Sequence, residues 1–254
     1  MLPARKIVFI ALYTALVTVV TASFAINVPA TKGYFNIGES AVYLVALLGG
    51  PYIGAFAGGV GSMLSDILLG YLFYAPGTLV IKAVEGGVLG FLATRKPRLS
   101  RRRWLLLSVV VAGVLFTSIY LLGVSYIIGD TQISLGFFDQ QGMPLQYSVF
   151  GLIVTLGATL NMDITPIFWV VIGGLVALFV ISTSFFARSE VGWLVMSAAA
   201  SGFFMVLGYF LYEVFIIQVA AIAEVPTNIG QVIIGIIIAV PAFKSLKSLQ
   251  RTKT

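Results

Sequence analysis

The residues best suited to chemistry lie in one stretch of the chain, from Thr31 to Glu85. This stretch places five ionisable side chains among residues otherwise suited to hydrocarbon: Lys32, Glu39, Asp66, Lys82 and Glu85. A charged side chain at the centre of a bilayer costs at least about 2.5–3.5 kcal/mol, so such residues usually face a cavity or the interior of a helical bundle. The stretch is therefore the first candidate for a binding site.

The sequence lacks the residues on which most catalytic and metal sites depend. It contains no cysteine and no histidine, which removes thiolate chemistry, the commonest general base and the commonest metal ligand. It also lacks the G-x-x-x-x-G-K-[ST] motif that binds ATP phosphates. A membrane enzyme that uses Glu and Asp as acid and base is disfavoured, because no paired-carboxylate motif is present. We therefore expect no enzyme activity, no metal and no cofactor.

The composition is that of an integral membrane protein. Of 254 residues, 59% are hydrophobic and only 9% are charged, against about 25% charged in typical soluble proteins. One soluble domain of this size cannot hide so much apolar surface from water. We expect a multi-pass protein of the cell membrane.

The positive charge is clustered rather than spread over a surface. The net charge is +6, and the basic residues border apolar runs at Arg5–Lys6, Arg95–Arg103 and Lys244–Lys253. This pattern is typical of cytoplasmic ends of membrane helices. A nucleic-acid partner is not expected, because the interleaved basic and aromatic surface that binds nucleic acid is absent.

Apolar runs and their Gly and Pro breakers define the expected helices. The segment Gln146–Leu160 is apolar but only 15 residues long, which favours an interfacial or re-entrant segment. Polar loops are expected over Val28–Ile37 and Gly129–Leu145. The expected helices are Ile7–Asn27, Gly38–Leu48, Tyr52–Leu69, Thr78–Thr94, Trp104–Ile128, Pro166–Ala187, Val191–Ile217 and Pro226–Phe243.

The basic clusters also predict the topology. If all three clusters are cytoplasmic, the numbers of crossings between them must be even. This favours eight crossings, both termini inside, and Gln146–Leu160 on the outer side. Most of the polar side chains of the helices then fall in the outer half of the membrane, with Lys82 and Glu85 about 6 and 10 Å below the outer helix end. An alternative is that Lys82 and Glu85, at i and i+3, simply neutralise each other.

A polar site with nearby tyrosines and no catalytic groups favours capture of a small amphipathic organic ligand. Tyrosine is, however, enriched at membrane interfaces in any case. An ion channel would show rings of like charge or a carbonyl filter motif. A stand-alone secondary transporter of a small organic solute remains the alternative, although similar broken helices in the two halves of the chain are not evident.

Several long motifs resemble a known family. They are T-K-G-Y-F-N-I-G-E, L-L-G-G-P-Y-I-G-A-F-A-G-G-V-G-S-M-L-S-D, Y-A-P-G-T-L-V-I-K-A-V-E-G, G-Y-F-L-Y-E and A-E-V-P-T-N-I-G-Q. In these, the chain resembles the substrate-binding S components of energy-coupling factor (ECF) vitamin transporters, in the riboflavin-type and hydroxymethylpyrimidine-type group. The resemblance covers Ile7–Thr94 and Val191–Leu246.

The resemblance implies an all-α membrane bundle with a six-helix core that captures a vitamin or precursor on the outer side. The ligand class would be riboflavin, hydroxymethylpyrimidine or thiamine, or pyridoxine. The loaded protein would topple in the membrane on a transmembrane coupling subunit driven by two ATPase subunits. The implied substrate-binding residues are Lys32, Tyr34, Asn36, Glu39, Tyr74, Lys82, Glu85, Glu213, Asn228 and Gln231.

A small-residue face on the first helix is the implied docking surface. It maps to Ala11 and Ala15, where small side chains would let another helix approach closely. Ordinary packing inside the protein's own bundle is the alternative reading of this face.

Three regions follow from the resemblance. Residues 1–95 hold the first four core helices and the outer substrate loop. Residues 96–190 hold a basic cytoplasmic loop and an insertion, Arg101–Glu190, with about two added membrane helices. Residues 191–254 hold the last two core helices and a basic tail.

Overall fold

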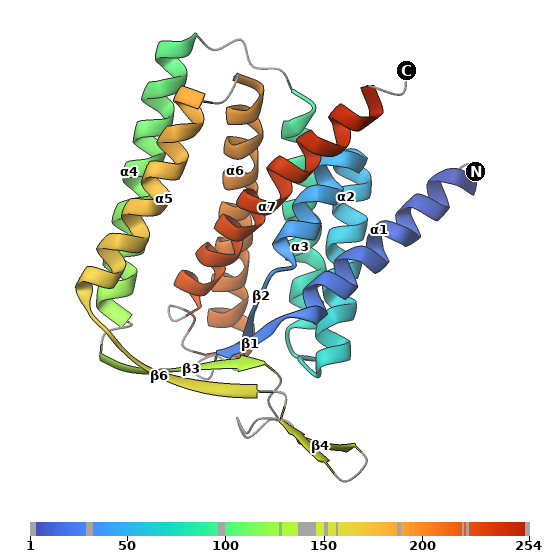
Figure 1. Ribbon diagram of the computed structural model, residues 1–254. Coiled ribbons are helices and arrows are strands. Elements are labelled where there is room, and N and C mark those ends of the chain that lie inside the picture. The colour runs from blue at the N-terminus through green and yellow to red at the C-terminus, as the bar shows by residue number, and fades with distance from the viewer. Residues whose placement is uncertain are drawn as a thin grey trace.

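The computed structural model shows a helical bundle with short strand pairs at one end (Figure 1). The structure describes residues 4–28, 33–95, 100–126, 129–136, 146–149, 152–155, 157–186, 189–219, 221 and 224–251.

Seven long helices carry the fold, and six of them are long and apolar enough to cross a membrane in the described part of the chain. Because the bundle is built from these helices, the prediction of an all-α membrane fold is confirmed. The helices are α1 (Ala4–Ser23), α2 (Glu39–Leu69), α3 (Ala75–Ala93), α4 (Arg101–Tyr126), α5 (Pro166–Phe186), α6 (Ser189–Tyr212) and α7 (Val225–Arg251), and α6 continues into a π-helical turn, η1 (Glu213–Ile217).

Helix α2 is a hairpin of two arms rather than one straight rod. Gly50 has φ 77° and ψ −171°, a conformation essentially restricted to glycine, and Pro51 follows it. A Cβ atom on Gly54 would lie 2.9 Å from Cα of Ala46. Residues eight apart in a continuous helix are about 12 Å apart, so the chain must reverse at Gly50. The two arms correspond to the predicted helices Gly38–Leu48 and Tyr52–Leu69.

Glycines allow α3 to pack closely on the second arm of α2. A Cβ atom on Gly54 would lie 2.6 Å from the carbonyl oxygen of Gly86, and one on Gly59 would lie 2.6 Å from that of Leu79. Backbones can approach this closely only where side chains are absent. This packing holds the face of α3 that carries Lys82 against α2.

In the described part of the chain, six short strands form three antiparallel pairs. β1 (Ala25–Val28) pairs with β2 (Gly33–Asn36) in the register Ala25↔Asn36 and Val28↔Gly33. The other pairs are β3 (Gly129–Gly136) with β6 (Gly157–Ile164), and β4 (Gln146–Val149) with β5 (Leu152–Thr155).

The strand pairs correct three sequence-based expectations. The expected loops Val28–Ile37 and Gly129–Leu145 contain strands, and the expected interfacial or re-entrant segment Gln146–Leu160 is largely strand. The physical reason is local composition: this last segment combines β-branched residues with glycines, which favours strands and turns. Pairing of strands also provides hydrogen bonds for their backbone groups.

The two ends of the bundle differ in character. The strands lie at the lower end in Figure 1, whereas both termini, the end of α3 and the start of α4 lie at the upper end. The helix ends that carry the described basic residues therefore lie at one end of the bundle, opposite the strands. This is the arrangement on which the predicted topology depends.

The main apolar core joins α1, α2, α3, α6 and α7, with Tyr43, Leu89 and Met205 among its fully buried side chains. Helices α4 and α5 form a pair at the side of this core (Figure 1). A second, smaller cluster around Ile119 and Trp169 packs this pair together. The pair matches the predicted helices Trp104–Ile128 and Pro166–Ala187.

Candidate functional site

A polar pocket lies at the strand end of the bundle, where β2, both arms of α2, α3, the end of α6 and the start of α7 meet. It is lined by Thr21, Gly33, Tyr34, Asn36, Gly38, Glu39, Ser62, Asp66, Tyr74, Thr78, Lys82, Tyr209, Glu213, Glu224, Asn228 and Gln231.

The hairpin in α2 explains how distant acidic residues reach the same pocket. Glu39 begins the first arm and Asp66 lies near the end of the second, so the reversal at Gly50 brings both to one end. Glu213 is the first residue of η1, and Asn228 lies in the first turn of α7. Segments far apart in sequence therefore contribute both walls.

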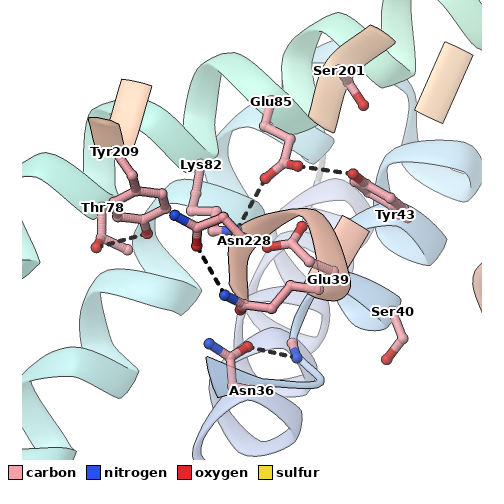
Figure 2. A network of polar contacts seen from close by, with 12 residues as sticks. Asn36, Glu39, Ser40, Tyr43, Thr78, Lys82, Glu85, Ser201, Tyr209 and Asn228 are labelled. Carbon is pink, nitrogen blue, oxygen red and sulfur yellow. Dashed lines mark hydrogen bonds and ion pairs between the residues drawn. The ribbon is translucent and has the colours of Figure 1, made fainter. Parts of the chain in front are cut away.

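A buried ionic cluster forms the inner part of the site (Figure 2). Nζ of Lys82 lies 3.1 Å from Oε2 of Glu85 and is also ion-paired with Glu39. The hydroxyl of Tyr43 donates to Oε1 of Glu85 at 3.0 Å. Lys82 is 5% exposed and both glutamates 1% or less. Lys82 and Glu85 do neutralise each other, but Lys82 also forms an ion pair with Glu39 of another helix. The alternative that Lys82 and Glu85 only neutralise each other is therefore incomplete.

The β1–β2 hairpin is fixed to α2 by one buried tyrosine. The hydroxyl of Tyr34 donates to Oδ1 of Asp66 at 2.7 Å, and its ring stacks on Tyr71 with centroids 4.4 Å apart. Burial, and then the charge of Asp66, raise the pKa of Tyr34 well above its ordinary value of 10. Tyr34 therefore remains a hydrogen-bond donor at physiological pH.

The ends of α3 and α6 add aromatic and hydroxyl groups. The hydroxyl of Tyr74 donates to Oε1 of Glu213 at 3.3 Å. The hydroxyls of Thr78 and Tyr209 are hydrogen-bonded at 3.0 Å (Figure 2). Nζ of Lys82 lies 5.6 Å from the centroid of the Tyr209 ring. Together these groups form a partly polar aromatic wall.

Side-chain amides complete the mouth of the pocket. Nε2 of Gln231 donates to Oδ1 of Asn228 at 3.0 Å on α7, and the backbone N–H of Gly38 donates to Oδ1 of Asn36 at 2.8 Å. Both bonds hold amide groups in fixed orientations at the pocket (Figure 2). Oriented amides of this kind can recognise donors and acceptors on a ligand.

The structure brings most of the predicted substrate-binding residues together. Lys32 lies outside the described residues, and Glu85 lies behind Lys82 instead of on the lining. The remaining eight line the pocket: Tyr34, Asn36, Glu39, Tyr74, Lys82, Glu213, Asn228 and Gln231.

Some lining residues were absent from the predicted set. Asp66 was recognised as a costly charge but not assigned to the ligand, and Glu224 was an isolated acid in a loop. Thr21, Ser62 and Thr78 carried no clear signal, because hydroxyl side chains in membrane helices commonly bond to their own backbone. The signal that could have assigned Glu224 to the site is that acidic residues are rare in so apolar a sequence.

The predicted docking residues are on the outside of α1. The face of α1 with Val17 and Thr18 packs on Gly61 of α2, and Oγ1 of Thr18 donates to its carbonyl at 3.0 Å. Ala11 and Ala15 are exposed. Packing within the protein's own bundle, the alternative reading of the small-residue face, therefore holds for Thr18, whereas Ala11 and Ala15 lie outside that contact.

Comparison with known proteins identifies the family. The family described as ECF-type riboflavin transporter, S component, matches residues 1–163. A protein from Pyrococcus woesei, described as "Uncharacterized protein in gap 3'region", is 41% identical over 112 residues, which is 44% of this chain and 72% of that protein. No solved structure matches. With its membrane-length apolar helices, the chain belongs to the S components of ECF-type riboflavin transporters and is a multi-pass membrane protein of vitamin uptake.

Proposed function

We propose that the protein captures a vitamin or vitamin precursor in the polar pocket on the outer side of the cell membrane, for ATP-driven uptake by partner subunits. The observation that carries the proposal is the pocket itself. It gathers buried carboxylates, a lysine, amides and tyrosines at one end of an otherwise apolar bundle. Ionisable groups in membrane helices are expensive to maintain unless they serve a site.

The orientation of the pocket follows from the basic clusters. Basic residues favour the cytoplasmic side, and the helix ends that carry the described basic residues lie opposite the strand end, where the pocket lies. With the arms of α2 counted separately, this supports eight crossings with both termini in the cytoplasm. The pocket then opens outward, where a scarce nutrient is captured.

The exposed alanines of α1 supply a surface for the coupling subunit. Ala11 and Ala15 are four residues apart, so they share one face of the helix. Small side chains let a helix of the partner approach closely inside a membrane. Docking there, on a coupling subunit with two ATPases, would allow the loaded protein to topple and release its ligand inside.

Uptake into proteoliposomes tests the complete proposal. We expect ATP-dependent uptake of a labelled vitamin only when this protein is reconstituted with the coupling subunit and both ATPases. Ala11→Trp should abolish uptake while leaving ligand binding intact, because it blocks docking alone. Leu121→Trp, on the exposed surface of α4, is the matched control and should be active. Uptake by this protein alone would identify a stand-alone transporter instead.

Binding to the purified protein tests the site. We expect Glu85→Gln to loosen the Lys82 cluster and Asn228→Ala to remove an oriented amide, so both should weaken binding of the transported vitamin by tenfold or more. Unchanged affinity in both variants would overturn the assignment of the pocket as the binding site.

A further inference from the structure

Carboxylates dominate the charge of the pocket. Glu39, Asp66, Glu213 and Glu224 line it, whereas Lys82 is the one basic residue of its described lining. A fifth carboxylate, that of Glu85, lies against Lys82. Within the structure described here, the pocket therefore carries a marked excess of acidic groups over basic ones.

The positive charge of Lys82 is already compensated by neighbouring carboxylates. Its ammonium group is ion-paired with both Glu39 and Glu85. If the three groups are ionised, the cluster has one net negative charge, so it repels an anion rather than attracting one. An anionic ligand would also have to approach Asp66 and Glu213.

Hydrogen-bond acceptors in the pocket lack partners. Oε2 of Glu213 and Oε2 of Glu39 are buried and have no hydrogen-bond partner among the described residues, and the same holds for the hydroxyl oxygens of Thr21 and Ser62. Glu213 and Glu39 are 0% and 1% exposed. Buried polar atoms are normally paired, and an ionised carboxylate can only accept. When Glu213 is ionised, the partner that its Oε2 lacks is therefore a donor or a cation.

The aromatic wall favours the same kind of ligand. The rings of Tyr74 and Tyr209 lie 6.4 Å apart between centroids, and Nζ of Lys82 already lies 5.6 Å from the Tyr209 centroid. The face of a tyrosine ring attracts cations and stacks on flat aromatic groups.

The pocket has an excess of acidic groups, buried acceptors without partners and the faces of tyrosine rings. These three features favour the same class of ligand. We infer that the pocket selects a flat heteroaromatic cation over uncharged and anionic vitamins. This inference rests on the proposed function and narrows it. The family match to riboflavin transporters ends at residue 163, before Glu213, Glu224 and the amides of Asn228 and Gln231, so that match does not cover this half of the pocket.

Isothermal titration of the purified full-length protein in detergent tests the inference. The probes are thiamine and pyridoxamine as cations, riboflavin as an uncharged vitamin and pantothenate as an anion. We expect at least one cation to bind tenfold or more tightly than riboflavin, and pantothenate not to bind. Glu213→Gln should weaken binding of that cation at least tenfold, because it removes the charge and keeps the shape.

The control variant is Glu190→Gln, which changes an exposed acid in the first turn of α6, at the end opposite the pocket. It should bind all four probes as the unaltered protein does. Riboflavin or pantothenate binding as tightly as both cations, or equal cation affinity in Glu213→Gln and Glu190→Gln, would overturn the charge selection but leave vitamin capture standing. Failure of all four probes to bind would instead overturn the proposed function, and the inference with it.

Discussion

At the scale of single residues, the ionic cluster shows why charge is tolerated in this bundle. Lys82 is placed between Glu39 and Glu85, and Tyr43 supplies Glu85 with a further hydrogen bond. Each charge is thus compensated by a neighbour on another turn or helix. Removing one partner leaves the others buried without compensation, which is far more costly than the intact cluster.

Lys82→Met is therefore expected to destabilise the protein by about 3–5 kcal/mol, because two buried carboxylates lose their shared cation. The free energy of unfolding in detergent, measured by denaturant titration, provides the value. Lys6→Met, at an exposed position on α1, is the matched control and should change stability by less than about 0.5 kcal/mol.

A second pair of variants separates charge from packing. Adding Glu39→Gln and Glu85→Gln to Lys82→Met should restore part of the lost stability, since the uncompensated charges are then gone. If Lys82→Met is as stable as Lys6→Met, the cluster does not hold the bundle together and this account is wrong.

At the scale of elements, the reversal in α2 organises the site. It turns a chain segment with an acid at each end into two antiparallel arms that present Glu39 and Asp66 to the same pocket. Close glycine contacts then hold α3 beside the second arm. The geometry of the pocket therefore depends on backbone contacts that involve none of its polar residues.

Gly54→Ala tests this dependence. The added Cβ would lie 2.6 Å from the carbonyl oxygen of Gly86 and 2.9 Å from Cα of Ala46, so backbone must move on two sides. We expect a loss of about 1–3 kcal/mol in unfolding free energy, as for other overpacked cores. Thermal unfolding followed by circular dichroism is a suitable measurement.

Gly113→Ala is the matched control, because a Cβ atom there would meet nothing within 4 Å. Alanine also favours a helix over glycine by up to about 1 kcal/mol, so this variant should be as stable as the parent or more so. If both variants were destabilised equally, the loss in Gly54→Ala could not be attributed to the close contact between α2 and α3.

The elements differ in how far the sequence predicted them. Long apolar runs and the Gly49–Pro51 breaker predicted the helices and the two arms of α2, because hydrophobicity and backbone freedom are local properties. The strand pairs were missed, since a short apolar run such as Gln146–Leu160 carries no periodicity that separates strand from helix. The predicted depth of Glu39 and Lys82 in the membrane was enough to place them near one site. Ser62 and Thr78 could be placed there only once the packing of the helices was known.

At the scale of the whole molecule, charge is distributed with a clear polarity. The helix ends with the described basic residues lie at the end of the bundle with the termini, and the acidic pocket lies at the strand end. Basic residues favour the cytoplasmic side of a membrane. The distribution therefore supports the proposed orientation without reference to any partner protein.

The absence of native cysteine allows this orientation to be tested with single-cysteine variants. Leu72→Cys and Thr165→Cys place a thiol at exposed positions near the strand end, on the turn before α3 and just before α5. Arg102→Cys and Ser248→Cys place one at exposed positions near the other end, on α4 and α7. A membrane-impermeant maleimide applied to intact cells should label only the first two, because they face outward in the proposed topology.

Permeabilised cells provide the control, since all four variants should then be labelled. The comparison of Arg102→Cys with Thr165→Cys is the strictest test of the number of crossings. It shows on which side of the membrane α4 begins and on which side α5 begins. Opposite accessibility of these two sites requires α4 to cross the membrane, with the β3–β6 region on the outer side.

Labelling of both from one side would mean that the α4–α5 pair does not cross, and the count of eight crossings would fall to six. Labelling of Ser248→Cys but not Leu72→Cys in intact cells would reverse the orientation and place the acidic pocket on the cytoplasmic side, where it could not capture a ligand from outside.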